Sequence, residues 1–293
     1  MLWFLMRLGI VTSILCATIC NAALVVGPND VSSSSTKKPI LVIGATGKLG
    51  RCIVSKLYER NIPYRCLVRK FSPNMDALSQ YISPDAEEQT IFEGDLASFD
   101  DVRNAVCSGD GISQCIVVSG SFRKRRASDL LLPFRGGKNK IKDTSHPYIV
   151  NHIGMQHLCK AIHELNSDNG QDVPTTKIVK VSGALLSLPQ WHYISLLGNM
   201  LYSGVMRWHK EGEKDVVQSG IPYTILRPGS FRDDVEFGHL KKELIVSEDG
   251  ALRPGIKVKK PMIGINDLAD ICIECLESRA EWDNKVLYPK CNV

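Results

Sequence analysis

Residues 40–50 read ILVIGATGKLG, and this stretch decides the fold. An apolar run of four residues is followed at once by glycines at positions 44, 47 and 50, and then by a helical stripe of apolar residues that begins at Leu49. Glycines at this spacing allow a tight turn, the close approach of a diphosphate to the backbone, and close packing of a helix on a strand. A helix N-terminus also offers unpaired N–H groups to an anion. The stretch therefore predicts a strand, a phosphate-binding turn and a helix.

The chain outward from this stretch alternates between strand-like and helix-like patterns. Strands are predicted at 40–43, 64–68, 90–92, 114–118, 177–181 and 223–226. Helices are predicted at 48–60, 100–106, 146–165, 207–218 and 267–281. Such alternation predicts a parallel sheet covered on both faces. We expect an α/β, Rossmann-like, doubly wound parallel sheet in one domain, residues 39–293, with a small C-terminal region on the substrate side.

Composition narrows the class of protein. The 293 residues are 44% hydrophobic and 23% charged, which excludes a disordered chain, a collagen-like repeat and a polytopic membrane protein. The net charge of +5 is mild and gives no argument for a nucleic-acid partner. Most of the ten cysteines stand singly in apolar runs, and Cys272 and Cys275 form a lone CxxC pair. We therefore expect reduced core thiols and no metal site.

The first 38 residues have the composition of a targeting segment. Residues 1–22 carry a single charge, Arg7, followed by an apolar run and small residues, which predicts a signal peptide. Residues 23–38 are rich in serine and poor in acids, which fits either a flexible linker or a transit peptide. A bipartite leader of this kind indicates a plastid location. A location in the endoplasmic reticulum, or a membrane anchor, is the alternative.

Five motifs, the glycine turn among them, carry a resemblance to a known family. They are GATGKLG at 44–50, CLVRK at 66–70, GDL at 94–96, KIVKVSG at 177–183 and SGIPYTILRPG at 219–229. Together they resemble the atypical short-chain dehydrogenases, the group that includes NmrA-like and flavin-reductase-like proteins, and the resemblance runs from Pro39 to about Tyr288. The chain is also similar to the NADP-binding subunit of the plastid protein-import machinery, including Trp208 and Glu213 in the helix before the last motif.

The expected cofactor is NADP rather than NAD. Sites that prefer NAD place an acid near the end of the second strand, whereas this chain has Arg69 there, with Lys70 beside it and Arg65 within the strand. A guanidinium can pair with a 2′-phosphate through two hydrogen bonds. The resemblance implies in addition that Asp95 contacts the adenine and that Ser119 and Gly120 line the cofactor. The expected cofactor-binding residues are Gly44, Thr46, Gly47, Lys48, Leu49, Gly50, Arg69, Asp95, Leu96, Ser119 and Gly120.

The sequence lacks the classical catalytic pair of the family and offers two other candidates. Classical relatives pair a tyrosine with a lysine four residues later, and no tyrosine of this chain has a lysine there. Ser182 ends the fifth predicted strand, and Lys210 lies near the position at which some relatives hold a catalytic lysine. Each also has an ordinary structural explanation, as a turn residue or a solvated charge. Two classes of function stay open: an NADP-dependent oxidoreductase that acts on a small acceptor, and a noncatalytic NADP-binding redox sensor or assembly factor.

The positive charge is concentrated in residues 121–143, SFRKRRASDLLLPFRGGKNKIKD. Eight bases and two acids give this segment a charge of +6, so the rest of the chain sums to −1. The segment is predicted to be a docking loop for an acidic protein or an anionic membrane surface, a lid over the cofactor phosphates, or a solvated loop. Residues 231–239, after the RPG motif, are expected to form part of a substrate lid.

Overall fold

The computed structural model describes residues 37–69, 75–81, 90–126, 129, 141, 143–170, 174–232, 242–247, 262–277, 279 and 281–291. Residues 1–36 are not among the described residues, so the predicted signal peptide and almost all of the serine-rich segment lie outside this part of the chain. Most of the basic segment after residue 126 and most of the expected lid at 231–239 also lie outside the described residues.

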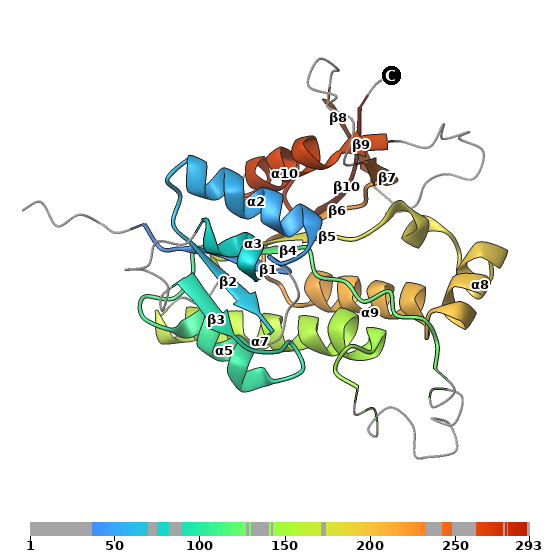
Figure 1. Ribbon diagram of the computed structural model, residues 1–293, viewed down its shortest axis with the longest axis horizontal. Coiled ribbons are helices and arrows are strands. Elements are labelled where there is room, and N and C mark those ends of the chain that lie inside the picture. The colour runs from blue at the N-terminus through green and yellow to red at the C-terminus, as the bar shows by residue number, and fades with distance from the viewer. Residues whose placement is uncertain are drawn as a thin grey trace, which may run out of the picture. The chain divides into compact units, whose positions relative to one another are not determined.

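A single eight-stranded sheet forms the centre of the folded unit, in the order β3-β2-β1-β4-β5-β6-β10-β8 (Figure 1). The strands are β1 (Ile40–Ile43), β2 (Tyr64–Val68), β3 (Ile91–Glu93), β4 (Gln114–Val117), β5 (Lys177–Val181), β6 (Tyr223–Leu226), β8 (Lys242–Ser247) and β10 (Lys285–Cys291). The first seven strands of this order are parallel, and β8 joins β10 in antiparallel register. The predicted Rossmann-like, doubly wound sheet is confirmed.

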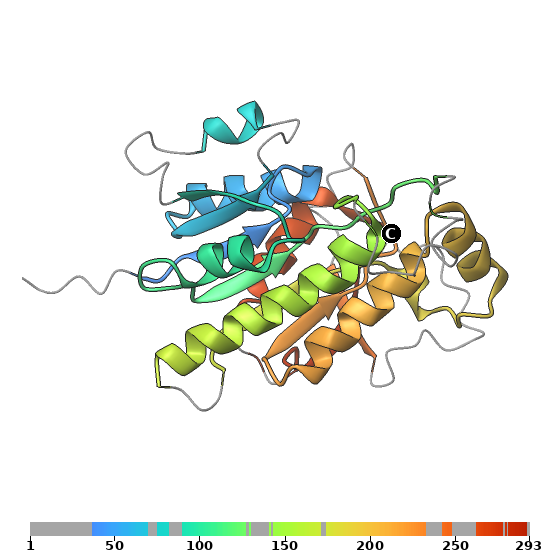
Figure 2. The same cartoon turned by 90° about the horizontal axis from the view of Figure 1, so that it is seen from below.

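Helices cover both faces of the sheet (Figures 1 and 2). One face carries α2 (Lys48–Glu59) and α10 (Ile265–Glu274), and the other carries α5 (Phe99–Cys107), α7 (Gly154–Asp168) and α9 (Val205–Gln218). Alternation along β1 supplies both cores: Val42 packs with the first pair of helices, whereas Leu41 and Ile43 pack with the second group. The order of the strands reverses between β1 and β4, which is where parallel sheets of this kind bind ligands.

Two of the predicted helices differ in the structure. The helix expected at 146–165 includes a π-helical turn, Ile149–Ile153, before α7. This turn brings the Asn151 carbonyl against Gly212 of α9, where any Cβ would lie 1.8 Å from the Asn151 oxygen. The prediction of one helix over 267–281 was wrong: α10 ends at Glu274. The chain must turn there because residues 285–287, at the start of β10, pair with β6.

Several elements were absent from the predictions. They are α3 (Asp76–Ser79), the 3₁₀ turn Ala184–Ser187, α8 (Tyr193–Leu201), the strand β10 and the edge strand β8, and a two-stranded parallel sheet of β7 (Ser230–Arg232) and β9 (Met262–Gly264). The small sheet and α8 follow the carboxyl ends of β6 and β5, so they lie on the predicted substrate side. None of the helices in the described ranges is long and apolar enough to span a bilayer.

Seven cysteines in the described part of the chain are free thiols. Five are buried, including Cys272 and Cys275 of the CxxC pair. Burial raises the pKa of both the Cys66 and the Cys275 thiols to about 12. Among the described residues no group of three or more His, Cys, Asp or Glu side chains is placed to hold a metal ion.

Candidate functional site

A cavity of about 410 Å³ opens at the carboxyl ends of β1, β2 and β4. Four loops that follow these strands and β3 form its walls, and the loop after β4 contributes Ser121, Phe122 and Arg123. Eight of the predicted cofactor residues line it: Gly44, Thr46, Gly47, Arg69, Asp95, Leu96, Ser119 and Gly120. Lys48, Leu49 and Gly50 form the first turn of α2 and are not among the described residues that line the cavity. The volume and position of the cavity suit a bound nucleotide.

Close packing explains two of the three glycines in the turn. Gly44 has a φ of +94°, and a Cβ there would lie 2.7 Å from the Ser119 backbone nitrogen. At Gly50 a Cβ would lie 2.1 Å from the Gly44 carbonyl oxygen, so only glycine lets α2 approach the end of β1 this closely. Gly47 is the N-cap of α2 and gives it no side-chain cap, which leaves the helix N-terminus facing the cavity.

The three bases near the end of β2 have different surroundings. Arg69 is exposed and lines the cavity directly after β2. Arg65 is buried instead, with its guanidinium 3.5 Å from the Ala105 carbonyl and 5.2 Å from the centre of the Phe92 ring. Lys70 lies outside the described residues. Arg69 is therefore the base of this group that the structure places at the cavity.

Asp95 lines the cavity and also stabilises a turn. Its carboxylate accepts a hydrogen bond from the Ala97 backbone at 3.0 Å, and its own backbone N–H donates to Asp101 at 2.8 Å. Asp101 also packs closely against Gly94, where a Cβ would lie 2.6 Å from the Asp101 Cβ. The turn between β3 and α5 is thus fixed, and it presents Asp95 and Leu96 to the cavity.

Ser119 supplies an independent sign that the cavity takes a polar ligand. Its hydroxyl oxygen is buried and has no hydrogen-bond partner among the described residues. Buried hydroxyl groups are normally satisfied, because an unpaired one costs about 1–3 kcal/mol. Together with the space left by Gly44, this unpaired hydroxyl group fits a ligand that carries its own hydrogen-bonding groups.

Ser182 and Lys210 form hydrogen bonds away from the first cavity. The Ser182 hydroxyl donates to Glu213 Oε1 at 2.5 Å, and Lys210 Nζ donates to the Leu188 carbonyl at 2.6 Å. Lys210 lines a second cavity of about 350 Å³, together with Glu213 and Arg227. Neither Ser182 nor Lys210 is among the described residues that line the first cavity.

Glu213 and Arg227 form a buried ion pair that joins two of the motifs found in the sequence. The Arg227 guanidinium lies 2.5 Å from Glu213 Oε2 and 3.2 Å from Oε1, and its Nη1 donates to the Tyr288 hydroxyl at 3.0 Å. Burial lowers the pKa of Arg227, but the Glu213 carboxylate more than offsets this, so the pKa is raised. The pair therefore holds α9 against the carboxyl ends of β5, β6 and β10.

Sequence reasoning missed a second buried group, Lys180 and His209. Lys180 lies on the α9 face of β5, is fully buried and has no hydrogen-bond partner among the described residues, and burial lowers its pKa. Both ring nitrogens of His209 also lack a partner there. The imidazole lies behind Gly120, whose Cβ would be 3.2 Å from it, and 5.4 Å from the Phe122 ring. A lysine between two valines inside a predicted buried strand was the available signal.

We expect His209 to make the protein sensitive to mild acid. Burial first, and the charge of Lys180 second, lower the pKa of His209 to about 3. The unfolded chain binds a proton near pH 6.5 and the folded chain does not, so this contribution to stability is present above pH 6.5 and is lost as pH falls toward 3. Between pH 7 and pH 5 the loss should be about 2 kcal/mol.

Urea unfolding of the wild type and of His209→Phe at both values of pH measures this effect. The variant should lose at least 1 kcal/mol less than the wild type over the same interval, as expected for about 2 kcal/mol from one histidine. Equal losses in the two proteins would show that other groups cause the acid sensitivity.

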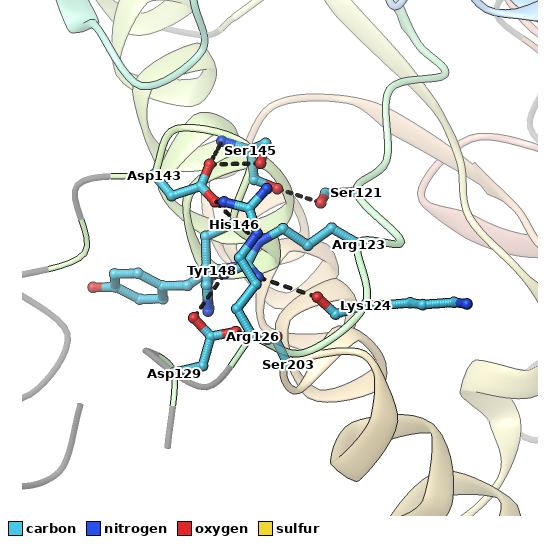
Figure 3. Close-up of polar contacts among 10 residues, drawn as sticks. All are labelled: Ser121, Arg123, Lys124, Arg126, Asp129, Asp143, Ser145, His146, Tyr148 and Ser203. Atoms are coloured by element: carbon cyan, nitrogen blue, oxygen red, sulfur yellow. Dashed lines mark hydrogen bonds and ion pairs between the residues drawn. The ribbon is translucent and has the colours of Figure 1, made fainter. Parts of the chain in front are cut away.

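The described part of the basic segment is anchored by ion pairs (Figure 3). Arg123 lies 2.9 Å from Asp129 and 3.2 Å from Asp143, and Arg126 lies 2.7 Å from Asp143. Ser203 precedes α9, and its hydroxyl group donates a hydrogen bond to the Asp129 carboxylate at 2.7 Å. Burial raises the pKa of Asp129, but hydrogen bonds from Arg123, Arg126 and Ser203 outweigh it and hold that pKa well below its usual range. Residues 121–126 are thus fixed beside the cavity.

Comparison with known proteins agrees with this geometry. Residues 44–279 match a family model described as NAD(P)H-binding. Sanguinarine reductase of Eschscholzia californica is 25% identical over 266 residues, which cover 84% of this chain and 87% of the relative. An uncharacterised chloroplast protein of Arabidopsis thaliana is 25% identical over 271 residues, 89% of this chain and 74% of the relative. Protein TIC 62 of the same plant is 22% identical and aligns over 83% of this chain but only 37% of its own length.

Solved structures share the fold. A short-chain dehydrogenase/reductase from Veillonella parvula, solved in complex with NADP, has a TM-score of 0.54 at 16% identity and covers 86% of this chain and 94% of its own. An anaerobillin reductase from Escherichia coli has a TM-score of 0.56 at 16% identity and covers 86% and 96%. From the family match and the Rossmann-like sheet with its glycine turn, the chain belongs to the NAD(P)H-binding family.

Proposed function

We propose that this protein is an NADP(H)-dependent oxidoreductase that acts on a small acceptor. The observation that carries the proposal is the cavity itself, in which the glycine turn, Arg69 and the unpaired Ser119 hydroxyl group face one space. The similarity to sanguinarine reductase over most of both chains supports it. When bound, the nicotinamide supplies the hydride.

In this proposal different residues of the cavity bind different parts of the cofactor. The glycine turn and the N-terminus of α2, including Thr46 and Lys48, take the diphosphate. Arg69 pairs with the 2′-phosphate, which favours NADP over NAD. Asp95 and Leu96 contact the adenine end, and Ser119 and Gly120 lie beside the nicotinamide half. The acceptor enters from the side of α8 and the loop after β6.

Transfer of deuterium from stereospecifically labelled NADPH to a panel of carbonyl, quinone and flavin acceptors tests the proposal. We expect deuterium in at least one reduced acceptor and faster turnover with NADPH than with NADH. Binding of NADPH without transfer to any acceptor would contradict the enzymatic proposal and leave cofactor binding intact.

A noncatalytic NADP(H)-binding redox sensor or assembly factor is the second candidate. Two observations favour it: the sequence lacks the Tyr–Lys pair, and both remaining catalytic candidates hydrogen-bond to other groups away from the first cavity. In this case NADPH binding changes capture of a partner and no hydride leaves the cofactor. The labelled-hydride experiment separates the two candidates.

Ser182→Ala and Lys210→Ala test the proposed catalytic residues directly. Because the structure places both outside the first cavity, we expect each variant to keep its NADPH affinity and to lose no more than about threefold in kcat. General acid–base catalysis is worth about 100-fold or more, so a loss of that size in either variant would establish it as catalytic. Urea unfolding serves as the control, because Ser182 also supports Glu213.

We propose a plastid location on the strength of the leader and of relatives named as chloroplastic. A fluorescent protein fused after residue 38 should enter plastids when expressed in the cells of origin. Retention in the endoplasmic reticulum would favour the anchored alternative, and export to the medium would contradict the proposal.

A further inference from the structure

Helix α8 has its apolar side chains turned toward solvent. Its sequence is YISLLGNML, and Tyr193, Leu196 and Met200 are 71%, 57% and 55% exposed. The side chain that it buries most fully is Ser195, which is only 1% exposed and whose hydroxyl group has no partner among the described residues. A surface helix of a soluble domain normally points its apolar stripe inward, so α8 is reversed.

The neighbouring chain enlarges this apolar surface. Trp191, two residues before α8, is 77% exposed, and Leu185 in the preceding turn is also exposed. No acidic residue occurs anywhere between positions 183 and 210. Large apolar surfaces that contain aromatic residues mark sites of interaction on soluble proteins. The absence of carboxylates over 28 residues indicates a partner that would repel them.

Bases of the loop after β4 lie against the C-terminal end of α8. The Arg125 backbone N–H donates to the Leu201 carbonyl at 2.8 Å, and its guanidinium lies 3.5 Å from the Met200 carbonyl. Lys124 and Arg126 are exposed on either side of it, and Arg207 is exposed just beyond α8. Figures 1 and 2 both show α8 projecting at the edge of the fold, beside the start of α9. The apolar face is therefore bordered by cations.

We propose that this surface, formed by Trp191–Leu201 with Lys124, Arg125 and Arg207, docks onto an anionic lipid bilayer. The apolar side chains of α8 enter the boundary between headgroups and acyl chains, and the bases contact lipid phosphates. Tryptophan and tyrosine prefer that boundary, and amphipathic helices with cationic borders lie in it. Each lysine or arginine near an anionic membrane raises the affinity of a protein for that membrane about fivefold.

Charge decides between this occupant and the alternatives. A second copy of the chain, related by a twofold axis, would bring identical cationic borders together. Residues 183–210 contain no acidic side chain that could neutralise this repulsion. An acidic protein would match the charge but would leave the outward apolar side chains of α8 to be covered by apolar groups of its own. A bilayer supplies both the negative charge and the apolar phase.

Sedimentation with vesicles tests the proposal on the full chain. Vesicles contain phosphatidylcholine alone or with 30% phosphatidylglycerol, a composition chosen for the assay. We expect at least tenfold tighter binding to the anionic vesicles, a loss of about 25-fold in Lys124→Gln/Arg125→Gln from two cations, and a loss of at least tenfold in Leu196→Gln/Met200→Gln. The matched control is Tyr58→Gln/Val217→Gln, which removes exposed apolar side chains from other helices and should bind as the wild type does.

A second readout separates α8 from the apolar leader, which all these proteins share. In a Trp3→Phe background, lipids with brominated acyl chains should quench Trp191 fluorescence, and Trp191→Phe should abolish that quenching, because Trp208 and Trp282 are buried. Absence of quenching with bound vesicles would overturn the proposal. So would a dimer in solution that the α8 variants dissociate, or binding to polyglutamate by a protein that ignores anionic vesicles.

Discussion

Arg69→Asp is expected to weaken NADPH binding by about 100-fold and NADH binding by less than threefold. Arg69 is exposed at the end of β2 and lines the cavity, where it meets the 2′-phosphate in the proposed arrangement. A charge-assisted hydrogen bond to that phosphate is worth about 1.5–3 kcal/mol, and a carboxylate adds repulsion. NADH has no 2′-phosphate, and an aspartate there can accept hydrogen bonds from its ribose instead.

Isothermal titration with both cofactors measures the change in preference. Arg103→Asp is the matched control, because it makes the same change of charge on the exposed surface of α5, outside the residues that line the cavity. It should alter both affinities equally and only slightly. Equal losses of NADPH and NADH affinity in Arg69→Asp would contradict the assignment of the 2′-phosphate to this residue.

Arg227→Met is expected to lower the free energy of unfolding by about 3–5 kcal/mol. The substitution leaves the Glu213 carboxylate, itself almost completely buried, without the guanidinium that lies 2.5 Å away. The Tyr288 and Ser182 hydroxyl groups that belong to the same network cannot neutralise it. Glu213→Gln should cost a comparable amount, because it leaves the guanidinium buried beside a neutral amide.

The double variant Arg227→Met/Glu213→Gln is the informative control. With both charges removed, it should recover at least half of the loss seen in Arg227→Met, because the uncompensated charge is gone. Arg279→Met breaks an exposed ion pair with Glu277 at 2.6 Å and should change stability little. Additive losses in the double variant, measured by urea unfolding, would show that packing rather than charge carries the effect.

The fold was predictable because strand and turn signals coincide over residues 40–50. An apolar run, three spaced glycines and a helical stripe all support the same local structure, and the first six strands follow the same alternation. The cavity was predictable for the same reason, since parallel strands present their carboxyl ends together. Arg69 was placed there by its position after the second strand, whereas Asp95 and Ser119 were expected there from the family resemblance.

Long-range packing determined what the sequence did not predict. Nothing local marks residues 285–291 as a strand, because β10 exists through its pairing with β6 and β8. The reversed orientation of α8 cannot be read from its composition, which alone suggests a buried helix. The rotation of α9 decides that His209, and not Lys210, is the buried side chain near the first cavity. The close contact of Gly212 with the π-helical turn sets that rotation.

Burial of the thiols has a consequence for the chemical lifetime of the protein. Only the thiolate form of cysteine reacts quickly with peroxides, and at neutral pH a thiol with a pKa of about 12 is ionised in roughly one molecule in 100,000. Cys66 and Cys275 thus stay inert in the presence of oxidants without being paired in disulfides. Burial alone is therefore enough to protect these two sulfur atoms from oxidation.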